Sequence, residues 1–146
     1  MILPITLVIA AAAGLINLWL AIRASAVRVK GKVMNGDGGN PLMLQRMRAH
    51  ANFTEYAPFV LILIAVIELA RGSSPWLWAV GLAFVLGRLA HLFGMDRPAP
   101  NPFRMTGIVL TWVVLLALSV WAAAIGYHGA AAPVHPSGTI VTAPGA

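Results

Sequence analysis

Two long stretches of this chain carry no charged residue, and they limit the possible folds more than any other feature. One runs from Ile2 to Ile22 and the other from Met105 to Tyr127. A helix needs about 20 apolar residues to cross the hydrocarbon core of a bilayer, which is roughly 30 Å thick. Only 10% of the residues are charged, against roughly 25% in soluble domains. Because so few polar side chains cannot coat a soluble domain, we expect the chain to lie in a membrane.

Two further segments are apolar but contain polar residues, and three Asn-Pro or Ser-Pro pairs mark where helices begin. A capping side chain followed by proline predicts helix starts at Pro41, Pro75 and Pro102, since the N–H that proline lacks would be unpaired there anyway. We therefore predict an all-α integral membrane four-helix bundle. Its helices are expected at about 2–22, 41–70, 75–95 and 102–127, with a disordered tail, rich in Ala, Pro and Gly, at 128–146.

The net charge of +6 predicts membrane topology rather than nucleic-acid binding, because the basic residues lie between apolar runs and form no continuous stripe. They concentrate in two connections, 23–40 and 96–104, whereas the opposite side has Arg71 alone. The positive-inside rule places these connections in the cytoplasm and both termini outside. The first apolar run exceeds the ~7–15 residues of a signal peptide, so we expect it to be retained.

Polar side chains of the predicted spans gather on the cytoplasmic side, where buried polarity usually marks function. At 100° per residue, Arg48, Asn52, Glu55 and Tyr56 lie within about 100° of one another. Arg48 and Glu55 are ~10 Å apart along the axis, which is about the length of an extended tripeptide. The spacing leaves two interpretations open, a ligand-binding strip and an internal polar ladder.

At the other end of the same predicted helix, Glu68 is expected to pair locally with Arg71, three residues later.

Arg104 stands at the predicted start of the fourth helix, where unpaired N–H groups favour an anion. It could anchor the helix at the headgroups or stabilise a bound thiolate. A thiol with a pKa near 8.5 is only a few per cent ionised at pH 7, and lowering that pKa by two units takes about 2.7 kcal/mol.

His50 and His91 lie at similar depth and keep a bis-histidine haem open as an alternative. The chain has no cysteine, which excludes thiolate metal sites, and apart from the haem alternative we predict no metal site.

Three motifs resemble those of the MAPEG family, the membrane-associated proteins in eicosanoid and glutathione metabolism. Residues 48–58, which read R-A-H-A-N-F-T-E-Y-A-P, are similar to the second-helix signature of that family. Residues 87–91 resemble the third-helix signature of its bacterial members, and residues 103–107 resemble the entry to the fourth helix. The resemblance covers about residues 1–127.

The resemblance implies a homotrimer in the bacterial inner membrane, with glutathione as co-substrate at the subunit interfaces and a lipophilic second substrate arriving from membrane lipid. It implies no nucleic-acid partner. It makes Arg104 the catalytic residue that stabilises the thiolate, and it makes Arg28 a contribution from the neighbouring subunit. The full set of expected glutathione-binding residues is Arg28, Arg48, Asn52, Glu55, Tyr56, Arg88 and His91.

The chain also departs from one branch of the family. His91 and Met95 stand where the leukotriene-synthase branch has tyrosines. The connection before Arg104 is also longer than the corresponding connection in that branch. These differences argue against a dedicated eicosanoid synthase. We therefore expect a membrane-bound glutathione transferase, with or without peroxidase activity. The alternative is a non-catalytic MAPEG-like scaffold or partner subunit.

Overall fold

The computed structural model describes residues 2–130, which form four helices. These are α1 (Pro4–Lys30), α2 (Pro41–Arg71), α3 (Pro75–Met95) and α4 (Pro102–Ala130). The helices α2, α3 and α4 begin at the prolines that the sequence singled out. The residue before each proline accepts hydrogen bonds from backbone N–H groups of the first turn, so all three starts are capped as expected: Asn40, Ser74 and Asn101.

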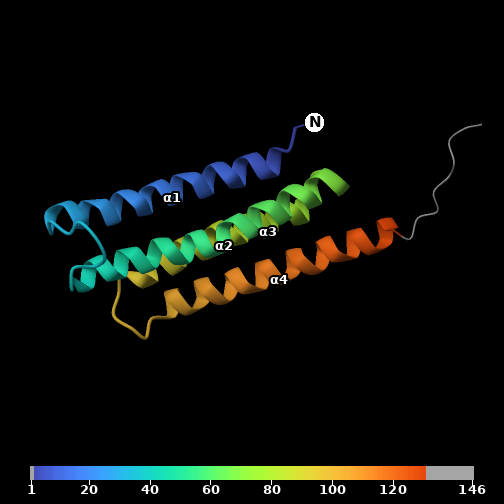
Figure 1. Cartoon of the computed structure of the whole chain (residues 1–146). Helices are drawn as coiled ribbons and strands as arrows, with labels where there is room; N and C mark the ends of the chain where they lie inside the picture. The colour runs from blue at the N-terminus through green and yellow to red at the C-terminus, as the bar shows by residue number, and fades with distance from the viewer. Residues whose placement is uncertain (1, 131–146) are drawn as a thin grey trace, which may run out of the picture.

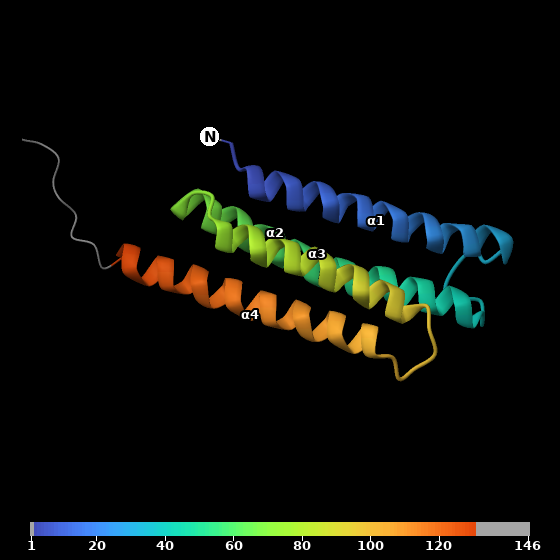
Figure 2. The same ribbon diagram turned by 180° about the vertical axis from the view of Figure 1, so that it is seen from behind.

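The helices run side by side, with α2 and α3 in the middle and α1 and α4 at opposite edges (Figures 1 and 2). Helix α1 packs mainly on α2 and α4 mainly on α3, and within the described chain the backbones of α1 and α4 do not come close to each other. The α1–α2 and α3–α4 connections lie at one end, whereas the N-terminus and the α2–α3 turn lie at the other (Figure 1). All four helices are long and apolar enough to cross a membrane.

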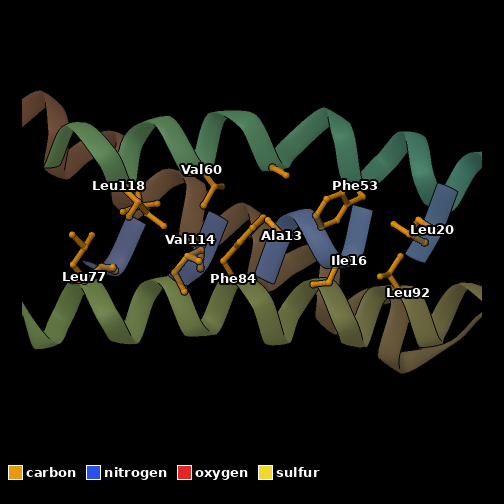
Figure 3. Packing of buried hydrophobic residues seen from close by; sticks show 14 of the residues in the cluster. Ala13, Ile16, Leu20, Phe53, Val60, Leu77, Phe84, Leu92, Val114 and Leu118 are labelled. Atoms are coloured by element: carbon orange, nitrogen blue, oxygen red, sulfur yellow. The ribbon is translucent and has the colours of Figure 1, made fainter. Parts of the chain in front are cut away.

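The core is a narrow stripe of apolar side chains along each helix, seen from close by in Figure 3. On α1 the buried residues recur every three or four positions, as a helical face requires: Ile5, Ile9, Ala13, Ile16 and Leu20. The outward faces are just as apolar, since Leu15 is 69% exposed and Leu116 is 66% exposed. Such extensive apolar surface suits lipid rather than water.

Helices α3 and α4 approach closely because glycines face the contact. A Cβ added to Gly107 would lie 2.5 Å from the carbonyl oxygen of Gly87 and 2.7 Å from the Cβ of His91. A Cβ added to Gly94 would lie 2.6 Å from the Cα of Arg104. Side chains do not fit at such distances, so the packing requires glycine. Small residues allow helix backbones to come together in the same way in other membrane proteins.

A buried glutamate of α2 caps the N-terminus of α1. Glu68 accepts hydrogen bonds from the backbone N–H groups of Ile5 (3.0 Å) and Thr6 (2.8 Å). The hydroxyls of Thr6 and Ser73 also donate to it, each at 2.7 Å. Helix α1 has no side-chain cap of its own, so the carboxylate satisfies N–H groups that a helix start leaves unpaired. The expected pair between Glu68 and Arg71 was wrong, because these four donors occupy the carboxylate instead.

Asp96 joins three helices at the opposite end of the bundle. It lies at the C-cap of α3 and accepts hydrogen bonds from Arg23 of α1, at 2.5 Å, and from Arg46 of α2. Next to it, the side-chain amide of Gln45 donates to the carbonyl of Met95. Polar contacts therefore hold α1, α2 and α3 together at the end that carries both long connections.

Two predicted boundaries were wrong. Helix α1 continues to Lys30 instead of ending near residue 22, and residues 128–130, predicted to be disordered, extend α4. Charged side chains limit the membrane-spanning part of a helix but do not end the helix itself. In α1 the basic residues of the last turn, Arg28 and Lys30, also interact favourably with the carbonyl end of the helix dipole. The rest of the predicted tail, 131–146, lies outside the described residues.

Candidate functional site

A groove of about 1050 Å³ lies between α2 and α4, at the end of the bundle with the two long connections. Helix α3 contributes the buried residues His91 and Met95, and residues 97–101 of the α3–α4 connection also line the groove. Its polar lining side chains are Gln45, Arg48, Asn52, Glu55, His91, Arg97, Asn101 and Arg104.

The charged side chains along this groove make no ion pair within residues 2–130. Arg48, Glu55 and Arg104 are exposed, and within residues 2–130 both ion pairs are made by Asp96. Within residues 2–130 no ion pair joins Arg48 or Glu55 to an internal ladder, which favours the ligand-binding interpretation of this strip. With Arg97, the groove carries three guanidinium groups and one carboxylate. This balance suits an anionic ligand that also has one cationic group.

Asn52 and Tyr56, from the same predicted strip, are bonded within the chain. Arg88 is fully buried and donates to Asn52 Oδ1 at 2.7 Å and to Thr111 Oγ1 at 3.4 Å. The Tyr56 hydroxyl accepts a hydrogen bond of 3.0 Å from the Trp112 indole N–H. These contacts join α2, α3 and α4 beside the groove. Arg88 and Tyr56 do not line the groove, so Arg88 acts on it through Asn52.

His91 and Arg104 meet where α3 and α4 are closest. The imidazole Nδ1 of His91 lies 3.0 Å from the backbone carbonyl oxygen of Arg104, in the first turn of α4. The glycine contacts at Gly94 and Gly107 make this short distance possible. Both side chains line the groove, although the His91 side chain is buried in its wall and that of Arg104 is exposed. The structure thus brings together two residues from different helices, a contact that the sequence had not predicted.

Arg28 lies away from the groove within this chain. Its guanidinium donates to the backbone carbonyls of Val33 and Met34, at 3.2 Å each. In this position the side chain stabilises the connection that follows α1.

The two histidines that suggested a haem site face different helices. His50 Nε2 lies 2.9 Å from Asn17 Oδ1 of α1, whereas His91 faces the start of α4. Because each ring is held by another group and they point to different partners, the structure does not support ligation of one haem by both. The described residues also contain no group of three or more His, Asp or Glu placed to hold a metal ion.

Several groove residues were not predicted from the sequence. Ile108 and Trp112 line the groove on α4, four and eight residues after Arg104, so the helical period counted from Arg104 would have found them. Gln45, three residues before the predicted strip, lies on the same face of α2 and could have been found in the same way. Arg97 could not, because the connection that carries it has no periodic structure.

The MAPEG family model matches residues 6–124. The chain belongs to the MAPEG family. Over 91 residues it is 31% identical to the inner membrane protein YecN of Escherichia coli (strain K12), a match that covers 62% of this chain and 68% of the relative. YecN of Escherichia coli O6:H1 matches to the same extent. The resemblance of the second, third and fourth helices to MAPEG proteins is thereby confirmed, and the chain is a MAPEG membrane protein with four candidate spans.

Proposed function

We propose that this MAPEG protein is a membrane-bound glutathione transferase, with or without peroxidase activity, that binds glutathione in the groove between α2 and α4. The observation that carries the proposal is the set of exposed charges along the groove that make no ion pair within residues 2–130: Arg48, Glu55 and Arg104. Glutathione has two carboxylates, one ammonium group and a thiol, which complement these charges. The family itself includes glutathione transferases.

Four groove residues have assigned roles in this proposal. Glu55 binds the ammonium group and Arg48 a carboxylate, since their axial separation of ~10 Å is close to the length of an extended tripeptide. Asn52, oriented by Arg88, offers its amide to the peptide backbone. Arg104 stabilises the thiolate through the positive charge of its guanidinium group, which lies in the first turn of α4. The thiolate then attacks a lipophilic electrophile.

The proposed assembly is a homotrimer in the bacterial inner membrane, with both basic connections in the cytoplasm and glutathione held between subunits. The exposure of Arg48 and Glu55 supports it, because one side of the groove is left for another subunit to cover. Arg28 of that subunit would join the site. The apolar part of the groove offers the second substrate a place next to lipid, since Trp112 is 53% exposed.

Replacing Arg104 with alanine tests the role of this residue in forming the thiolate. Removal of a positive charge disfavours the anion, so the thiol pKa of bound glutathione should rise by up to about two units. Turnover at pH 7 should fall by up to about 100-fold, recover partly at higher pH, and leave glutathione affinity much less affected. The measurements are the pH dependence of the rate and the ultraviolet absorbance of the thiolate. An unchanged pH profile, equal to that of the control Arg71→Ala at the far end of α2, would make Arg104 a headgroup anchor.

Glu55→Gln tests the binding of the ammonium group, because it keeps the shape of the side chain and removes its charge. A hydrogen bond to a charged group contributes about 1.5–3 kcal/mol, so glutathione affinity should fall roughly 10- to 150-fold by calorimetry. The oligomer mass in detergent should stay unchanged, since helix packing in lipid depends mainly on van der Waals contacts. Full affinity combined with a dissociated oligomer would instead favour the scaffold interpretation of this protein.

A further inference from the structure

The hydrogen bond between His91 and Arg104 determines where the hydrogen of the imidazole lies. A backbone carbonyl oxygen can only accept, so the Nδ1 atom, 3.0 Å from the Arg104 carbonyl, carries the hydrogen. A neutral imidazole has a single N–H group, and its other nitrogen is then an acceptor. The contact therefore leaves the lone pair of Nε2 free to accept a proton.

The Nε2 atom of His91 is also unpaired. No hydrogen-bond partner for it occurs in the part of the chain that the structure describes. Within residues 2–130 the side-chain nitrogens that are both fully buried and unpaired are Arg23 Nη1 and Arg88 Nε, and His91 Nε2 is not one of them. Since His91 lines the groove, the proton acceptor lies in the groove wall, and the same residue is bonded to the first turn of α4, where Arg104 is placed to stabilise an anion.

The charged groups around His91 are mostly cationic, and they come from every element that borders the groove. Arg88 precedes it by one turn on α3, and Arg104 lies on α4. The remaining charges along the groove belong to α2 and to the α3–α4 connection: Arg48, Glu55 and Arg97. This environment stabilises an anion that a proton transfer would leave next to the ring.

We propose that His91 Nε2 is the base that removes the proton from the thiol of bound glutathione. The S–H bond breaks, its electron pair stays on sulfur, and a new N–H bond forms at Nε2 while the Nδ1–H group remains on the Arg104 carbonyl. The ring then releases the proton to water in the groove. This inference rests on the proposed function and divides the chemistry in two. Arg104 determines how much thiolate exists at equilibrium, and His91 determines how fast it forms.

The variant His91→Asn separates these roles. The asparagine amide can take the place of Nδ1–H and donate to the Arg104 carbonyl, but it has no acceptor at the position of Nε2. The experiment mixes the full-length protein in detergent with glutathione and follows the thiolate by ultraviolet absorbance in a stopped-flow instrument. A general base contributes about 10²- to 10⁴-fold, so thiolate formation should slow by about 100-fold or more. The final amplitude and the glutathione affinity should stay within a few-fold, and added imidazole should restore the rate in proportion to its concentration.

Three results would overturn the inference. The first is an unchanged rate of thiolate formation in His91→Asn. The second is a loss of glutathione affinity as large as the loss of rate, without rescue by imidazole, which would make His91 a positioning residue. If His91→Asn fails to fold, His91→Gln is judged by the same measurements, because its amide lies near the position of Nε2 and cannot take up a proton. The third result is a wild-type protein that binds glutathione without forming any thiolate, which refutes the transferase proposal as well and is thereby distinguishable from the first two.

Discussion

Replacing Gly107 with alanine is expected to force α3 and α4 apart and to lower the free energy of unfolding by about 3 kcal/mol or more. The added Cβ would lie 2.5 Å from the carbonyl oxygen of Gly87. Overpacking usually costs about 1–3 kcal/mol, and here the obstructing atoms belong to the backbone and cannot turn aside. The separation should also stretch the contact between His91 and Arg104. Thiolate formation should therefore be lost together with stability.

The matched control for this substitution lies on the same helix. Gly126 has nothing within 4 Å of its added Cβ, so Gly126→Ala should leave the packing intact. It should even stabilise α4 by up to about 1 kcal/mol, because alanine favours a helix more than glycine does. Both variants are compared by unfolding titration with a denaturing detergent. Equal stability of the two would show that the close contact between α3 and α4 does not contribute to the fold.

Glu68→Gln is expected to destabilise the bundle by roughly 3–5 kcal/mol, because the amide cannot replace both oxygens of the carboxylate. Each oxygen accepts one backbone N–H of α1, from Ile5 or Thr6. The NH₂ group of glutamine would face one of these donors. Hydrogen bonds to a charged acceptor contribute about 1.5–3 kcal/mol each, and the substitution weakens both. The same unfolding titration measures the loss.

Two controls distinguish this helix cap from a general effect of charge. Glu55→Gln makes the same chemical change at an exposed position of the same helix and should alter stability by less than about 0.5 kcal/mol. Arg71→Ala should have as little effect, because Arg71 makes no ion pair with Glu68 in the described chain. A large loss of stability in Arg71→Ala would instead support the ion pair between Glu68 and Arg71 that the sequence suggested.

The sequence predicted most of the fold because its signals are local. A capping side chain next to proline determines a helix start within a few residues, and this was enough for α2, α3 and α4. The spacing on α2 also grouped Arg48 and Glu55 correctly on one face, where the structure leaves both exposed along a groove. The end of α1 was missed because hydropathy indicates where the membrane-spanning part of a helix ends, and this helix continues beyond that point.

The contacts between helices could not be predicted, because no local signal specifies them. The spacing placed Asn52 beside Arg48, but it could not show that buried Arg88 of α3 holds its amide oxygen. Nor could it show that Glu68 caps a helix more than 60 residues away in the chain. Such partners depend on how the helices are turned about their axes, and that rotation results from the packing of the whole bundle.

The polar contacts at the two ends of α1 have a mechanical consequence. Near its start α1 is bonded to α2 through Glu68, and towards its other end Arg23 is bonded to Asp96 after α3. A slide of α1 by one helical pitch, 5.4 Å, would break both connections at once. Since the helices cannot shear past one another cheaply, a thinner or thicker bilayer should be accommodated by tilting the bundle as a rigid body. The groove would then keep its shape in membranes of different thickness.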